Sequence, residues 1–255
     1  MRVTVRATVA PLLAEARASA AQVSQLIRGH HAEVLERAGA WLRLRGVDGY
    51  EGWCHTGYLA STTGPDTTPI HSAWKDERRM SLGCVVRRAT DLPFALPLGA
   101  LLDPDEVVIT GLAMNHRGRS RYFAADAQLL IRRTQELFAG TPYQWGGVTP
   151  WGADCSGVVQ TMFALHGMQL PRDAWQQGEA GTDVPSDIAA LRPGDLLFFS
   201  DRTDGHITHV ALSIGGSQIA HCSLVNGGFA LNALDATDPI AAHLRQTFRF
   251  ARRIL

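Results

Sequence analysis

The sequence has no excess charge of either sign. Its 24 lysines and arginines balance 24 aspartates and glutamates, so the formal net charge at pH 7 is zero. A nucleic-acid-binding chain usually has a basic surplus, so the composition predicts no nucleic-acid partner. The sequence also lacks any apolar run near the roughly 18 residues that a membrane-spanning helix needs. We therefore expect an ordinary globular protein with no membrane partner, and its oligomeric state stays open.

Cysteines are few and widely separated. None of the four belongs to a C-x-x-C pair, which argues against a structural zinc site and against a thioredoxin-like redox motif. Such sparse usage is compatible with a reducing compartment. The four positions are Cys54, Cys84, Cys155 and Cys222.

The first twenty residues only partly resemble a secretory signal. Arg2 and Arg6 are followed by a small-residue stretch at 18–20, but the apolar segment Ala7–Ala14 is short and contains Pro11. A signal peptide normally has a longer apolar centre and a neutral cleavage region. The sequence therefore favours a cytoplasmic protein, with a periplasmic or secreted location as the alternative.

The first half of the chain has the pattern of short strands. Apolar and polar residues alternate between residues 30 and 60, and Asp48-Gly49 is a hairpin signal. We expect a small antiparallel barrel in residues 1–62. Residues 63–122 then contain a linker, whose Gly/Thr/Pro-rich composition begins at Ser61, and a possible second, degenerate barrel over 80–112.

The second half, residues 123–255, combines helices with strands. Asp126 is a candidate N-cap for a helix that ends at Gly140, and its apolar face is expected to hold Leu129, Leu130, Leu137 and Phe138. Strands are expected over 196–200, 209–214 and 218–223, with a turn at 215–217. Helices packed on an antiparallel sheet define the α+β class.

Cys155 opens a further helix, which the apolar spacing predicts to end at Gly167. The partial positive charge of a helix N-terminus favours a thiolate, so the position suits a nucleophile. Cysteine is also among the most buried residue types, which leaves a structural role open. Whether Cys155 has a catalytic or a structural role depends on the residues near it.

Histidine is the natural partner for such a thiol, because it exchanges protons near neutral pH. His209 and His221 lie on the two strands joined by the turn at 215–217, so the hairpin is expected to bring them together. One would act as the base and the other would orient it. His206 is the nearest competitor, but it lies at the edge of a loop.

Four blocks of the second half closely resemble the NlpC-type cell-wall cysteine peptidases, which have a papain-like fold. Ahead of them, Gly52-Trp53 and Tyr58-Leu59 resemble the "GW" and "YL" elements of bacterial SH3-like domains. The whole chain is similar to γ-D-glutamyl-L-diamino-acid endopeptidases. The four blocks, in family order, are "TPYQWGGVTPWGADCSGVVQTMF", "LPRDAWQQG", "LRPGDLLFF" and "ITHVALSIGGSQIAH".

The resemblance implies a role for each matching residue. It makes Cys155 the nucleophile, His209 the general base and His221 the orienting third member. It places three further residues, Tyr143, Asp154 and Ser156, at the substrate.

Asp154 has two possible roles at that position. It would pair with the free amine of an N-terminal L-alanine or stabilise the helix dipole, or do both. The chain departs from some relatives at Ala174, where they have serine. The nearby Arg172 and Asp173 are expected to be structural.

The implied reaction is hydrolysis of the γ-D-glutamyl to L-diamino-acid bond of murein peptides, in recycling or turnover. It needs no cofactor and no metal. Barrel residues that would close the amine pocket, such as Glu15, Glu51 and Tyr58, stay unranked. The alternatives are an amidase or acyltransferase on the same scaffold, and a non-catalytic cell-wall binding protein.

Overall fold

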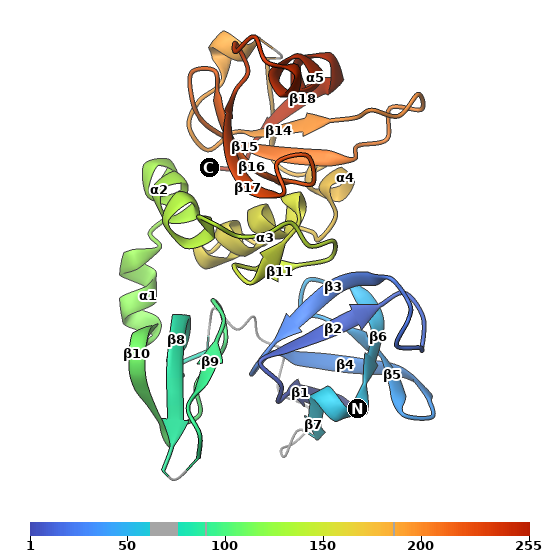
Figure 1. Ribbon diagram of the computed structural model, residues 1–255, viewed down its shortest axis with the longest axis vertical. Coiled ribbons are helices and arrows are strands. Elements are labelled where there is room, and N and C mark those ends of the chain that lie inside the picture. The colour runs from blue at the N-terminus through green and yellow to red at the C-terminus, as the bar shows by residue number, and fades with distance from the viewer. Residues whose placement is uncertain (62–75, 90, 186) are drawn as a thin grey trace. The chain divides into compact units, whose positions relative to one another are not determined.

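The computed structural model describes residues 1–61, 76–89, 91–185 and 187–255 (Figure 1). The chain forms two compact units, Met1–Tyr122 and Phe123–Leu255. The second unit starts at the first residue of the range expected for the peptidase domain. The expected linker, apart from Ser61, falls largely outside the described residues.

Unit 1 begins with a seven-stranded antiparallel barrel in the order β3-β2-β6-β5-β4-β1-β7. Asp48 and Gly49 lie in the turn between β5 and β6, where Gly49 has φ +79° and Asp48 accepts a hydrogen bond from the Tyr50 N–H at 3.1 Å. The predicted hairpin is therefore confirmed. The strands are β1 Arg2–Val5, β2 Val9–Leu13, β3 Gln22–Ile27, β4 His31–Ala38, β5 Trp41–Arg45, β6 Glu51–His55 and β7 Leu59–Ser61, with a short 3-10 helix, η1 Thr56–Tyr58, before β7.

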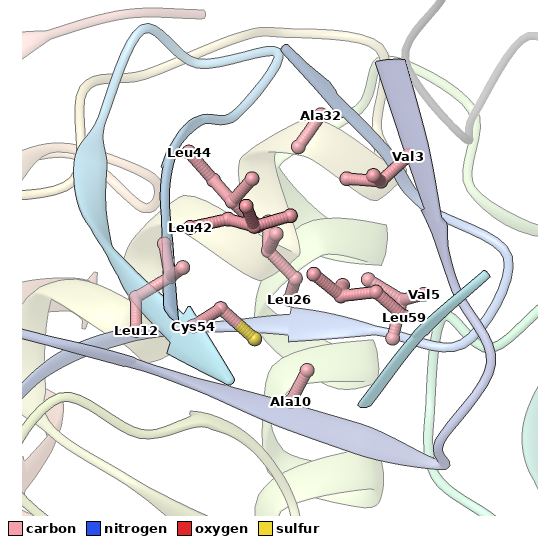
Figure 2. Close-up of a cluster of buried hydrophobic side chains, with 10 residues drawn as sticks. All are labelled: Val3, Val5, Ala10, Leu12, Leu26, Ala32, Leu42, Leu44, Cys54 and Leu59. Carbon is pink, nitrogen blue, oxygen red and sulfur yellow. The ribbon is translucent and has the colours of Figure 1, made fainter. Parts of the chain in front are cut away.

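The barrel core comes from the inward-facing residues of these strands (Figure 2). Leu42 and Leu44 alternate with exposed Arg43 and Arg45 on β5, as expected for a strand with one buried face. Each fully buried leucine contributes about 1.5–3 kcal/mol by removal from water. The barrel therefore has a core of its own.

The rest of unit 1 is a small open sheet. β8 Met80–Arg88 pairs with both β9 Phe94–Leu96 and β10 Glu106–Met114, and helix α1 His116–Tyr122 follows. The sequence suggested a second degenerate barrel here. The described residues form three antiparallel strands, and this sheet is not closed.

Unit 2 is built on a six-stranded antiparallel sheet in the order β13-β18-β14-β15-β16-β17. Figure 1 shows helix α5 on one side of this sheet and helices α2 and α3 on the other. The strands are β13 Thr182–Val184, β14 Leu196–Phe199, β15 His209–Gly215, β16 Gln218–Ser223, β17 Gly228–Ala233 and β18 Phe248–Arg253. The helices are α2 Ala127–Phe138, α3 Cys155–Leu165, α4 Ala174–Gln177 and α5 Pro239–Thr247, with a 3-10 helix, η3 Ile188–Ala190.

The predicted α+β class, with helices packed on an antiparallel sheet in residues 123–255, is confirmed. Asp126 caps α2 by accepting the Leu129 N–H at 2.8 Å, as expected. The buried face of α2 differs in detail, because Ile131 is buried while Leu129 and Leu137 are only partly so. Among the described residues, no helix combines the length and apolarity needed to cross a membrane.

Candidate active site

Helix α3 begins where the sequence predicts. Cys155 is the first residue of α3, and the Asp154 side chain caps the helix by accepting the Gly157 N–H at 2.7 Å. A two-stranded ribbon, β11 Val148–Thr149 and β12 Gly152–Ala153, leads directly into it. Cys155 is 8% exposed. The site therefore lies where a tight ribbon meets a buried helix.

Asp154 is held within the protein by a buried ion pair. Its two oxygens accept from the Arg172 guanidinium at 2.6 and 3.0 Å, and Oδ2 also accepts the Gly146 N–H at 2.8 Å. Ser156 Oγ donates to Asp154 Oδ1 at 3.2 Å and accepts from Arg172 at 2.9 Å. Arg172 is 2% exposed. The expected structural role of Arg172 is thus visible, with Asp154 as its partner.

The two histidines are brought together by the hairpin of β15 and β16. His209 Nε2 lies 2.7 Å from His221 Nδ1, and His221 Nε2 lies 2.8 Å from Asn232 Oδ1 on β17. The amide of Asn226 donates to the same Asn232 oxygen at 3.0 Å. The predicted pairing of His209 with His221 is present in the structure.

The contact with Asn232 favours one arrangement of the protons on the two rings. An amide oxygen only accepts, so His221 carries its proton on Nε2 and presents a bare Nδ1 to His209. His209 then donates from Nε2, and its Nδ1 is left free of a proton. His209 is therefore oriented as a base, with Asn232 at the far end of the chain.

Cys155 lies against the strand that carries this base. The backbone N–H groups of Val210, which follows His209, and of Ser156 act on the Cys155 thiol to lower its pKa. Helix α3 packs on β15 and β16. The fold thus brings the thiol to the His209 end of β15.

Burial shifts the pKa values of Cys155 and His209 away from the charged forms. It raises the pKa of Cys155 to about 12, with the Asp154 carboxylate as a further cause. Burial, and then His221, lowers the pKa of His209 to about 3. The helix N-terminus was expected to favour a thiolate. Burial opposes that effect, because loss of hydration disfavours both charged forms.

Tyr143 and Ser156 both lie next to the segment that contains Cys155. Tyr143 forms a parallel bridge with Ala153, and burial together with the nearby Cys155 raises its pKa well above the usual range. Ser156 follows Cys155 directly and is 5% exposed. Their expected contact with substrate stays a prediction.

Sequence reasoning missed Asn232 and Asn226. Asn232 is paired with Ile219, two residues from His221 on the neighbouring strand, and so lies on the same face of the sheet. The signal available in the sequence was a polar residue, Asn232, in the strand that follows the one carrying His221. Once β16 and β17 are paired, the alternation of the strands predicts the contact with His221.

Two further residues lie near the site in the sequence or in space. The thiol of Cys222 lies 3.1 Å from the carbonyl oxygen of Ala153, two residues before Cys155. His206 is exposed, and its ring packs at 5.9 Å from that of Trp175. His206 is not part of the His209–His221 contact.

Comparison with known proteins identifies the class to which each part belongs. Residues 140–243 match the NlpC/P60 family, and residues 8–60 match the bacterial SH3 domain. The chain therefore contains an NlpC/P60 domain preceded by a bacterial SH3 domain. This confirms the resemblance drawn from the sequence motifs.

Individual relatives match over part of their length. The gamma-D-glutamyl-L-lysine dipeptidyl-peptidase of Bacillus subtilis (strain 168) is 44% identical over 92 residues, covering 36% of this chain and 30% of that protein. Its namesake in Bacillus cereus (strain ATCC 10987) is 40% identical over 89 residues, covering 34% and 26%. The probable endopeptidase NlpC of Escherichia coli (strain K12) is 43% identical over 89 residues, covering 34% and 56%.

A solved structure also matches over the full length of the chain. The crystal structure of an NlpC/P60 family protein from Bacillus cereus ATCC 10987 covers 100% of both chains with a TM-score of 0.76. The two sequences are 19% identical, so the likeness concerns the fold.

Proposed function

We propose that the protein is a cysteine endopeptidase that hydrolyses the γ-D-glutamyl to L-diamino-acid bond of murein peptides. The observation that carries the proposal is the chain His209–His221–Asn232, which orients a base beside the buried thiol of Cys155. The names of the two Bacillus relatives support the bond type.

The reaction starts from the neutral pair. As substrate displaces water, the Cys155 thiol transfers its proton to His209 Nδ1 while sulfur attacks the peptide carbonyl carbon. Backbone N–H groups at the start of α3 stabilise the oxyanion. His209 then protonates the departing amine as the C–N bond breaks, which leaves a thioester on Cys155.

The second half of the reaction regenerates the enzyme. His209, again neutral, takes a proton from a water molecule while the oxygen of that water attacks the thioester carbonyl carbon. The carbon–sulfur bond breaks, and the sulfur recovers a proton from His209. His221 and Asn232 hold the imidazole in one orientation through both halves, as the third member of a cysteine-histidine triad does.

The proposal includes a preference for peptides with a free N-terminal L-alanine. Asp154 was the expected partner of that amine, but it already accepts hydrogen bonds from Gly146, Gly157, Ser156 and Arg172. Direct pairing with the substrate amine therefore requires one of these donors to move. Peptides with a free alanine are already cut from glycan, so a recycling role and a cytoplasmic location form part of the proposal.

The test is mass-spectrometric hydrolysis of synthetic L-Ala-γ-D-Glu-diamino acid, in lysine and diaminopimelate forms. The same peptides acetylated on alanine, and the Cys155→Ala variant, run in parallel. We expect cleavage of the free peptides by the wild-type protein alone. Equal cleavage of the acetylated peptides would remove the amine preference, whereas turnover by Cys155→Ala would exclude the nucleophile.

The alternative activities are separated in the same assay. Hydrolysis of N-acetylmuramoyl-L-alanine amides, with the tripeptide left intact, would indicate an amidase on this scaffold. Saturable binding of the tripeptide without cleavage would indicate a binding protein.

A further inference from the structure

Unit 1 contains a cavity of about 570 Å³ whose lining residues all lie between Thr4 and Asp103. Strand β1, the loops after β1 and β3, and residues near β7 form one wall. The ends of β8 and the segment before β10 form the other. This volume lies within the range of small-molecule sites.

The lining is strongly basic. Four arginines contribute to it, and Asp103 is the one acid among the lining residues. Clustered guanidinium groups repel one another unless acids or a bound anion compensate them. The four are Arg6, Arg28, Arg78 and Arg88.

Acidic side chains form ion pairs with three of these arginines. Arg28 donates to Asp103 and Glu106, each at 2.7 Å, and Arg88 pairs with the same Asp103 oxygen. Arg78 pairs with Asp76 at 2.8 Å. Glu106 is 1% exposed and also accepts the Asp103 N–H, so it lies behind the arginines rather than across the cavity. These pairs hold the guanidinium groups in place.

Arg6 is different. It is exposed and donates to the Gly57 carbonyl oxygen at 3.1 and 2.9 Å, and no carboxylate of the described residues lies within ion-pair distance of it. Arg88 Nε lies 3.4 Å from Glu106 Oε1 and 3.6 Å from Asp105 Oδ2, so the charge of Arg88 is compensated. Arg6 is therefore the lining arginine whose charge no acid of the described residues balances.

We propose that this cavity binds a phosphate ester, at a site distinct from the peptidase site and independent of the proposed function. Arginine presents a rigid fork of donors that matches phosphate oxygens. A tetrahedral phosphate accepts from several directions at once, which suits guanidinium groups arriving from both walls better than a planar carboxylate does. The volume leaves room for the organic part of the ester.

The experiment is calorimetric titration of the full chain with glycerol 3-phosphate and inorganic phosphate at constant ionic strength, with succinate as the carboxylate probe. We expect saturable binding of the phosphates and none of succinate. Arg6→Gln should weaken binding by about tenfold, the effect of losing one charge-assisted contact. Ala60→Glu places an acid at an exposed lining position and should abolish binding.

Arg37→Gln is the matched control, because it removes the same charge from an exposed position of β4 that is not part of the lining. It should bind as the wild type does. Vesicles that contain phosphatidylglycerol distinguish a lipid-borne phosphate from a soluble one, and capture lost in Arg6→Gln supports the same site. No saturable phosphate binding, equal binding of succinate, or unchanged binding in both lining variants would overturn the proposal.

Discussion

At the scale of single residues, burial favours the neutral forms of the Cys155 thiol and the His209 imidazole. Burial shifts the two pKa values in opposite directions, up for Cys155 and down for His209. Charge separation then occurs only during attack on a substrate that excludes water. We expect the neutral pair to be the reactive form, so activity should persist as the pH falls below the ordinary histidine pKa of about 6.5.

The first prediction concerns the thiolate itself. The difference in absorbance at 240 nm between the wild type and Cys155→Ser should show no thiolate at pH 7, because burial raises the Cys155 pKa to about 12. The signal should grow only at strongly alkaline pH. A titration step between pH 4 and 7 would instead indicate a preformed thiolate–imidazolium pair.

The second prediction concerns Asn232, which acts through His221 and is therefore a positioning residue. Asn232→Ala should lower kcat by roughly tenfold to a hundredfold with little change in KM, because the His209 tautomer is no longer fixed. Asn232→Asp keeps an acceptor oxygen and should restore most of kcat. A rise in KM alone, or no rescue by aspartate, would contradict this role.

At the scale of elements, the start of α3 is tied to the segment before α4 by the Asp154–Arg172 ion pair. The pair aligns the ribbon, the helix N-terminus and residue 172 around Cys155. Both partners are buried, so the pair orders the site while its net effect on stability depends on complete pairing.

The third prediction follows from that pairing. Arg172→Met leaves Asp154 buried without its counter-charge, so the free energy of unfolding should fall by about 3–5 kcal/mol. Adding Asp154→Asn removes the stranded charge and should recover part of the loss. Urea unfolding measures both variants. Arg202→Met, in an exposed pair with Asp204, is the control and should show no resolvable change.

The fourth prediction concerns His166, which ends α3. Its Nδ1–H donates to the Ala124 carbonyl at 2.6 Å, and burial lowers its pKa. Below about pH 6.5 the unfolded chain therefore binds a proton more readily than the folded chain, and stability falls as the pH drops.

His166→Gln should reduce this loss of stability by up to about 1.4 kcal/mol per pH unit. Urea unfolding at pH 7.5 and 5.5 measures the difference between the variant and the wild type. Parallel slopes for the two proteins would contradict the assignment.

At the scale of the whole molecule, each unit has its own hydrophobic core. Leu44 belongs to the core of unit 1 and Leu197 to that of unit 2, and both are fully buried. A cavity in one core should therefore act first on the unit that contains it.

The fifth prediction tests this separation. Leu44→Ala should destabilise unit 1 by about 2–5 kcal/mol through lost burial and a residual cavity. Hydrogen exchange followed by mass spectrometry should show faster exchange in peptides of unit 1 and little change in unit 2. Leu197→Ala is the matched control and should show the reverse. Equal acceleration in both units would mean that they unfold together.

Local sequence patterns predict much of the fold. The cap at Asp126, the hairpin at Asp48-Gly49 and the histidine hairpin all depend on neighbours in the sequence, so the sequence predicts them. The open form of the β8–β10 sheet was not predictable in this way, because closure depends on strand partners that no local signal specifies.

A cysteine at a helix N-terminus and two histidines on one hairpin are visible in the sequence, and they indicate the class of chemistry. The burial of that site, the pairing of Asp154 with Arg172, and the contact of Asn232 with His221 are visible only in the folded chain. These depend on burial and on contacts between segments far apart in the chain. The spacing of apolar residues shows which face of a helix or strand is buried. It does not show which other segment packs against that face.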